Sequence, residues 1–299
     1  MLNQVALLSL LMFLCLLVAC NRPAISQTSD PVEKASPSPT ERAPVPEQLI
    51  DIFLDEDTLL HHGFEVRRLK KTIDYEYPIE DGKRRSIPIE ISYAVVKRNG
   101  KLLAEFDGPY FGHGNITDFG LFDLLGDGSQ QVIISTTVFR GGRHWVVSLH
   151  REFRVLFDSG NSREEFSVID LDKDGIYEIS LPVTAFYSMP DLMYTGEIPL
   201  PEIIYKYDAD KKVYLPANAL YLDYSLGGID DEIRSLDEKD RYFSKRLRIL
   251  LRYIYAGKEA DGWAFFDSAY QHPDKQKMKS RIQSVLNNEP VYKYLQQSK

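Results

Sequence analysis

Cysteine is almost absent from this sequence. Only Cys15 and Cys20 occur among the 299 residues, and both lie close to the N-terminus. A disulfide framework needs paired cysteines spread through the chain, and the C-x-x-C pairs of many structural zinc sites are missing. We therefore expect the fold to be stabilised by its hydrophobic core, with a bound metal ion as a further contribution.

Sequence patterns of common enzymes are missing as well. The chain has no G-x-S-x-G elbow, no Walker loop, no G-x-G-x-x-G and no H-E-x-x-H. Its six histidines are scattered and do not form a set of three or four converging zinc ligands. Adjacent carboxylates such as Glu164 and Glu165 keep a hydrolase open as the alternative, because folding and not adjacency sets a catalytic pair. We expect a protein without catalytic activity.

Positive charge is in short supply, with 36 Lys and Arg residues against 44 Asp and Glu residues and a net charge of −8. A protein that binds nucleic acid needs a basic face, so this balance argues against a nucleic-acid partner. At 299 residues the chain can bury one large core or two smaller ones, and we expect two folded parts.

The N-terminus has the sequence pattern of an export signal. Residues 5–19 form an apolar run that is too short to span a bilayer comfortably and has the length of a signal-peptide core. The run leads into LVAC, ending at Cys20, which resembles the lipobox of bacterial lipoproteins. That resemblance implies a signal peptide of residues 1–19, cleavage before Cys20 and lipidation of its sulfur. The alternatives are an uncleaved anchor or a plain secretory signal with an incidental Cys20.

Residues 20–48 are rich in Pro, Ser, Thr and charged residues, with almost no large apolar side chain. Such a segment cannot bury enough surface to offset its conformational entropy, so we expect a tether that reaches roughly 30 Å as a coil. By the lipoprotein resemblance, acylated Cys20 holds the chain to membrane lipid in the bacterial cell envelope. Asn21 stands where an Asp would favour the inner membrane, so the outer membrane is preferred.

Residues 49–216 have the pattern of a β-rich domain. A short helix is predicted at Leu49–His62, where apolar residues gather on one helical side. Beyond it apolar residues alternate, which predicts strands separated by the turn pairs Asp81-Gly82 and Asn99-Gly100 and joined in an antiparallel meander. The predicted strands are Phe64–Leu69, Thr72–Tyr77, Ile87–Val96 and Leu102–Phe106.

An acidic loop between Phe166 and Leu181 gives the clearest signal of a binding site. It has the spacing of a calcium loop, with hard oxygen ligands at alternate positions and Gly175 at the sixth. The twelfth position is Leu181 and not the Glu of an EF-hand, so a strand-loop-strand site is favoured. The alternative is a metal-free turn in which the Asp side chains accept hydrogen bonds from their own backbone. The predicted ligands are Asp170, Asp172, Asp174, the carbonyl of Ile176, and Glu178.

The acidic loop recurs within an internal repeat. Across Tyr93–Leu215 this repeat resembles the FG-GAP and VCBS-type repeats of integrin-alpha-like propellers, which implies calcium in the D-x-D-x-D-G loop. In the first copy Leu125 replaces the middle aspartate, so Asp123 and Asp127 are expected to bind calcium weakly or not at all. Two and a half repeats are too few to close a propeller, which predicts a partial propeller-like stack or a compact sandwich. The aligned positions are Phe106-Asp107 with Phe157-Asp158, and Asp123, Asp127 and Gly128 with Asp170, Asp174 and Gly175.

Residues 217–299 have helical periodicity and predict a small bundle. The segment Ser235-Leu236-Asp237-Glu238 has the form of a capping box, and Gly257 supplies the stop of the helix that follows. An aromatic stripe at helical spacing is expected in the core, with a partner-binding surface as the alternative. Its members are Trp263, Phe266 and Tyr270.

These features predict an α+β fold, with an antiparallel β meander or partial propeller-like repeats followed by a small C-terminal helical bundle. The expected function is that of a membrane-anchored envelope lipoprotein, a binding or scaffold module stabilised by calcium. Its partner would be an envelope protein or a polysaccharide. The alternative is an envelope hydrolase that uses carboxylates of the β part.

Overall fold

In the computed structural model, Val45–Lys299 form one compact unit, and most of its residues are described. The predicted signal peptide (1–19), Cys20 and the tether up to residue 48 lie outside the described residues. The described residues are 56–79, 82–108, 116–138, 141–160, 162, 167–189, 199–236 and 243–297.

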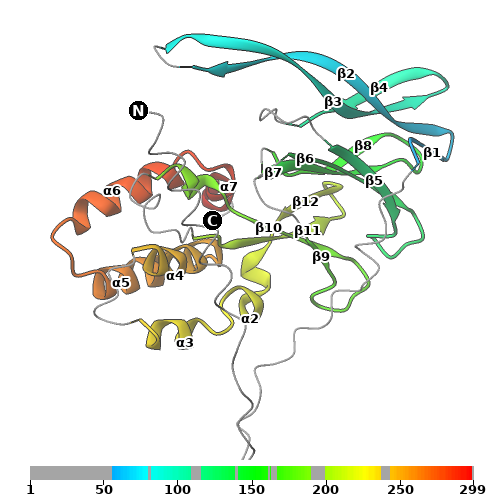
Figure 1. The fold of residues 1–299 in the computed structure, drawn as a ribbon. Helices are drawn as coiled ribbons and strands as arrows, with labels where there is room; N and C mark the ends of the chain where they lie inside the picture. The colour runs from blue at the N-terminus through cyan, green and yellow to red at the C-terminus, as the bar shows by residue number, and fades with distance from the viewer. Residues whose placement is uncertain are drawn as a thin grey trace, which may run out of the picture. The chain divides into compact units, whose positions relative to one another are not determined.

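Twelve strands among the described residues form three four-stranded antiparallel sheets (Figure 1). In every sheet, strands that follow each other in the chain pair with each other, so each sheet is a meander, as predicted. The first sheet contains β1 (Thr58–His61), β2 (Phe64–Pro78), β3 (Arg84–Arg98) and β4 (Lys101–Phe106). The second contains β5 (Ile116–Phe122), β6 (Gln131–Val138), β7 (Gly141–Ser148) and β8 (Arg154–Asp158). The third contains β9 (Ser167–Ile169), β10 (Glu178–Pro182), β11 (Glu202–Asp208) and β12 (Val213–Pro216).

The first sheet corrects two details of the sequence analysis. The helix predicted for Leu49–His62 is wrong where the structure describes it, because Thr58–His61 pair with β2 as a strand and bury Leu59. The two strands predicted within 64–77 are one continuous strand, β2, which stays in register with β3 from Phe64 to Pro78. The hairpin turn predicted at Asn99-Gly100 is confirmed, since both residues have positive φ.

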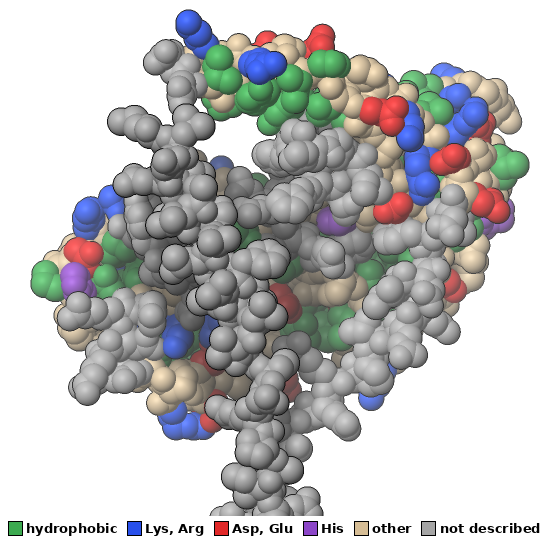
Figure 2. Space-filling view, viewed as in Figure 1, with side chains coloured by type: hydrophobic (Ala, Val, Ile, Leu, Met, Phe, Trp, Pro, Cys, Tyr) green, Lys and Arg blue, Asp and Glu red, His purple; other side chains and the backbone are tan. Residues whose placement is uncertain are grey.

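The first sheet also carries its charges in opposite pairs. Figure 2 shows Lys and Arg interspersed with Asp and Glu on the visible surface. Cross-strand ion pairs join Lys70 to Glu90 at 3.0 Å and Arg84 to Glu76 at 3.3 Å. These pairs are exposed, so each contributes little to stability and mainly keeps the outer surface of the β2–β3 ribbon polar.

The three sheets pack face to face through alternating side chains. On β6, Val132 and Ile134 join a buried cluster with residues of the first sheet, while Ile133 joins a second cluster with residues of the third sheet. Successive residues of a strand point to opposite faces, so the second sheet is buried on both faces. This packing explains why the apolar run at β6 does not alternate with polar residues.

The C-terminal part is helical, as predicted, and the fold class is α+β. Its elements are η4 (Asn218–Leu220), α2 (Leu222–Ser225), α3 (Ile229–Arg234), α4 (Phe243–Tyr255), α5 (Glu259–Ala269), α6 (Lys275–Leu286) and α7 (Pro290–Gln297). Among the described residues, no helix combines the length and the apolar character that crossing a membrane requires.

Of the three local predictions for the helical part, one is wrong and two are confirmed. The capping box at Ser235 is wrong, because Ser235 is the C-cap of α3 and its hydroxyl donates to the Glu232 carbonyl. The stop at Gly257 is confirmed, since α4 ends at Tyr255 and Gly257 has a φ of 78°. The aromatic stripe lies in the core, with the side chain of Phe266 fully buried.

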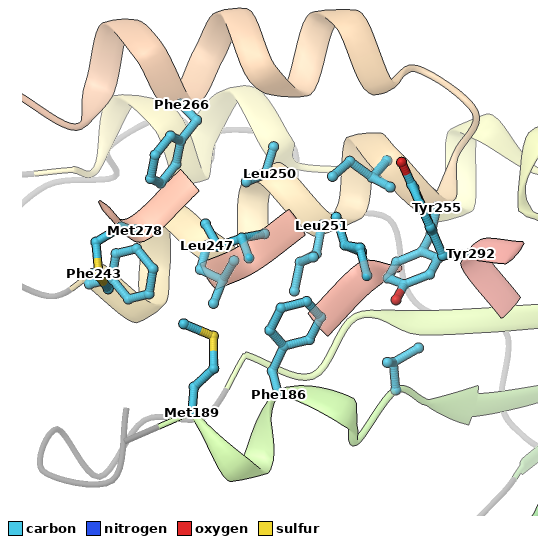
Figure 3. Close-up of a cluster of buried hydrophobic side chains, with 14 of the residues drawn as sticks. Phe186, Met189, Phe243, Leu247, Leu250, Leu251, Tyr255, Phe266, Met278 and Tyr292 are labelled. Atoms are coloured by element: carbon cyan, nitrogen blue, oxygen red, sulfur yellow. The ribbon is translucent and has the colours of Figure 1, made fainter. Parts of the chain in front are cut away.

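One buried cluster joins the helices to the third sheet and its connection. The short 3-10 helix η3 (Ala185–Ser188), between β10 and β11, inserts Phe186 into the helices (Figure 3). Figure 3 shows Phe186 pointing toward Leu251, with Met189 beside it. Ile203 of β11 belongs to the same cluster. The segment before residue 216 therefore supplies part of the helical core, and the division of the chain at 216 stays a prediction.

Candidate cation site in the second acidic loop

The second acidic loop connects β9 and β10, so it is flanked by strands, as predicted. Asp170 Oδ2 accepts the backbone N–H of Gly175 at 3.1 Å, and Asp174 Oδ1 accepts that of Ile176 at 2.8 Å. Lys173 and Gly175 have positive φ, at 61° and 84°, which turns the chain back toward β10. The Asp side chains therefore shape the loop through its own backbone.

Glu178 is the innermost carboxylate of the loop and is fully buried. Its Oε2 accepts the N–H of Leu171 at 2.9 Å and so ties the start of the loop to its end. Its Oε1 accepts the hydroxyl of Tyr221 at 2.7 Å. A buried carboxylate needs a compensating charge as well as hydrogen bonds.

That charge comes from Lys206 of β11. Its ammonium donates to Asp172 Oδ2 at 2.8 Å, to Asp174 Oδ2 at 3.0 Å and to Glu178 Oε1 at 3.2 Å. The hydroxyl of Tyr221 lies 3.0 Å from the same nitrogen. One lysine thus lies among three carboxylates that belong to the predicted ligand set.

The charges of this group reinforce one another. The hydrogen bond from Lys206 is the main cause that lowers the pKa of Asp172. Burial alone lowers the pKa of Lys206, but the hydrogen bonds to Asp172, Tyr221, Asp174 and Glu178 outweigh it and raise that pKa. Burial is the largest influence on Tyr221 and raises the pKa of its phenol. The raised pKa of Lys206 and the lowered pKa of Asp172 both favour the charged forms of this pair.

The donor set could also hold a metal ion. Asp170, Asp172 and Asp174 can each direct one oxygen so that the three atoms lie within 4.8 Å of one another. Asp170 Oδ1 is buried and has no hydrogen-bond partner among the described residues. Carboxylate oxygens at alternate positions suit a hard cation. The carbonyl of Ile176 stays a predicted ligand.

The first acidic loop, between β5 and β6, has the same hydrogen-bond pattern. Gly128 N–H donates to Asp123 Oδ2 at 3.0 Å, and Ser129 N–H donates to Asp127 Oδ1 at 2.8 Å. Gln131 stands where the second loop has Glu178, and its Oε1 accepts the N–H of Leu124 at 2.7 Å. The two copies therefore share one local fold, although the first lacks the middle aspartate and the buried carboxylate.

The two acidic loops also touch each other. The N–H of Tyr177 donates to the carbonyl of Leu124 at 2.8 Å. Gly126 lies so close to the carbonyl oxygen of Gly175 that a Cβ atom at Gly126 would overlap it. Sequence spacing predicts each loop but not this contact, because it depends on how the second and third sheets stack.

Searches against protein-family models, curated proteins and solved structures find no match for this chain. The role of the loop therefore has to be inferred from its own geometry. Lys206 and Tyr221 were not predicted as site residues. They lie 28 and 43 residues after Glu178, and only the pairing of β10 with β11 and the position of η4 bring them to it.

A hollow lies elsewhere, on the surface of the helical part. It has a volume of about 680 Å³ and is open to solvent. Its described lining contains an indole, a lysine, hydroxyls and side-chain amides, without a carboxylate. The lining residues are Trp263, Lys279, Ser280, Gln283, Ser284, Asn287 and Asn288.

Proposed function

We propose that this chain is a lipoprotein of the bacterial cell envelope that binds a partner without catalysing a reaction. The LVAC sequence and the polar tether support the anchoring, with acylated Cys20 in membrane lipid and the outer membrane preferred. More than one acyl chain gives stable attachment, because each buried methylene contributes about 0.8 kcal/mol. The partner would be an envelope protein or a polysaccharide.

The observation that carries the non-catalytic role is the position of Lys206. A glycosidase-type hydrolase needs two carboxylates that face a substrate, with one of them free to donate a proton. In the acidic loop, Asp172, Asp174 and Glu178 all accept hydrogen bonds from one ammonium. The hollow on the helices has no carboxylate among its described lining residues. This arrangement favours a binding module over the envelope hydrolase.

Calcium is the ion we propose for the second loop. The ligands would be Asp170, Asp172, Asp174, Glu178 and the carbonyl of Ile176, with Asp123 and Asp127 as a weaker site or none. Extracellular calcium modules can work with dissociation constants of about 10⁻⁴ to 10⁻³ M, so a tight site is not required. Binding would add stability that rises with the logarithm of the calcium concentration once this exceeds the dissociation constant.

The anchoring is tested by replacing each cysteine in the full chain, expressed with export in a bacterium. Cys20→Ser should leave the precursor uncut and without acyl label, because lipid transfer needs the thiol. The matched control Cys15→Ser should be cut and labelled normally. Normal processing and labelling of Cys20→Ser would contradict the lipoprotein proposal.

The calcium proposal is tested by the melting temperature of the full chain in detergent. Millimolar calcium should raise the melting temperature of the wild type, since only the folded loop assembles the ligands. Asp172→Ala should abolish the rise, and Asp127→Ala in the first loop should keep it. A melting temperature that neither calcium nor a chelator changes would show that the loop is a metal-free turn.

A further inference from the structure

We propose that Lys206 is a tethered cation that takes the place of the metal ion in the second acidic loop, so that calcium binds there only by displacing it. This inference rests on the proposed calcium site and concerns its regulation. In this view the loop is folded in both states, and calcium concentration decides which cation it holds.

The position of the ammonium is the first support. The Lys206 nitrogen lies 2.8, 3.0 and 3.2 Å from oxygens of Asp172, Asp174 and Glu178. A calcium ion bound to these carboxylates at about 2.3–2.6 Å would need the same space. Two positive charges at one position repel each other strongly, so both cations cannot be held together.

The first acidic loop gives the second support. There Gln131 replaces Glu178, and its partner across the sheet is Ser148. In the third sheet Ile179 pairs with Tyr205, and this register places Lys206 opposite Glu178. The buried carboxylate and the ammonium therefore occur together in one copy and are absent together from the other. Lys206 therefore accompanies the buried carboxylate of Glu178, with its nitrogen 3.2 Å from Oε1.

An unused oxygen gives the third support. An ammonium has only three N–H donors. Four oxygen partners, including Tyr221, already lie within hydrogen-bond distance of Lys206. Asp170 Oδ1 stays buried without a partner among the described residues. Calcium takes six to eight oxygen ligands, so it could use this atom where the lysine cannot.

Displacement of Lys206 would affect the start of the helical part. Tyr221, which precedes α2, donates its hydroxyl to Glu178 at 2.7 Å and lies 3.1 Å from Asp172. Arg252 of α4 donates to the carbonyl of Ser225 at the end of α2. An exchange of cations at the loop therefore changes the contacts of a segment that leads from β12 to the helices.

The test is calcium titration calorimetry on the full chain in detergent, with calcium chloride as the only titrant. Lys206→Met keeps the length of the side chain but removes the competing charge, and should bind calcium at least about tenfold more tightly than the wild type. Lys211→Met is the matched control, because it removes one exposed lysine from the β11–β12 turn and changes the net charge equally. It should bind calcium as the wild type does.

A second measurement uses the wild type alone and does not depend on how a variant folds. Acetylation of lysines by an active ester, followed by mass spectrometry, should find Lys206 protected without calcium and reactive at saturating calcium. Equal calcium affinity in the wild type and Lys206→Met, or continued protection of Lys206 in the calcium-bound chain, would overturn the exchange and leave the calcium site standing. Absence of calcium binding in both chains would overturn the site and the exchange together.

Discussion

Gln131 and Glu178 hold equivalent places in two successive sheets. Each side chain is fully buried, and each accepts the backbone N–H of the residue seven positions earlier, Leu124 or Leu171. The bond that closes the loop is thus kept, while the charge differs. In the first loop the neutral amide of Gln131 needs no counter-charge. In the second loop the carboxylate of Glu178 is accompanied by the ammonium of Lys206.

The equivalence of Gln131 and Glu178 predicts what happens when the amide in the first loop is replaced by a carboxylate. Gln131→Glu should lower the free energy of unfolding at pH 7 by about 3 kcal/mol, because it buries a carboxylate without a cation. Adding Ser148→Lys, at the position paired with Gln131, should restore much of that loss. Urea unfolding of both single variants and the double variant measures the coupling. Additive effects of the two changes would contradict the proposed role of the lysine.

The close approach of the two acidic loops predicts a difference between two glycines. Gly126 and Gly128 both have positive φ, at 65° and 77°, but a Cβ atom would collide with Gly175 only at Gly126. Alanine at Gly128 should cost about 1 kcal/mol from the backbone strain alone. Alanine at Gly126 should cost about 1–3 kcal/mol more, because the loops must move apart. Chemical unfolding measures both, and equal losses would argue against contact between the loops.

Glu289 predicts a pH dependence in the helical part. Burial raises the pKa of this carboxyl above its usual 4.5, although it accepts the N–H groups of Val291 and Tyr292 at the start of α7. The folded state therefore binds a proton that the unfolded state releases, so the free energy of unfolding falls as pH rises through 4.5 and above.

Unfolding of the wild type and Glu289→Gln between pH 4 and pH 7 tests this expectation. The amide of the variant does not titrate. As pH rises, the free energy of unfolding of the wild type should therefore fall relative to that of Glu289→Gln. A constant difference across this range would show that Glu289 keeps an ordinary pKa in the folded chain.

The shared core predicts that η3 stabilises the helical part. Phe186 is fully buried among helical residues, and Phe186→Ala should lower the free energy of unfolding by about 3–5 kcal/mol. Leu220→Ala is the control, because the Leu220 side chain is 73% exposed and should change stability little. Thermal unfolding followed by circular dichroism in the far ultraviolet measures both. A small effect of Phe186→Ala would indicate a helical bundle that is stable without the β part.

Local patterns predicted much of the β architecture because they act over a few residues. The Asn99-Gly100 turn, the alternation around Val96 and the aspartates of the loop at Asp170 all determine backbone geometry nearby. Tertiary contacts explain the predictions that were wrong. Thr58–His61 form a strand because they pair with the edge of β2. Ser235 is the C-cap of α3 and not the N-cap of the next helix. The sequence alone could not predict Lys206 as a site residue, because its position depends on which residues face each other across β10 and β11.

The burial of the second sheet on both faces has a consequence for how such a chain can change in length. Because β5–β8 contact the first sheet through Val132 and the third sheet through Ile133, this sheet is the middle layer of the three. The first sheet and the helices act as end caps that shield the array from water. If such a middle layer were duplicated, the first sheet and the helices would still cover the two ends of the longer array.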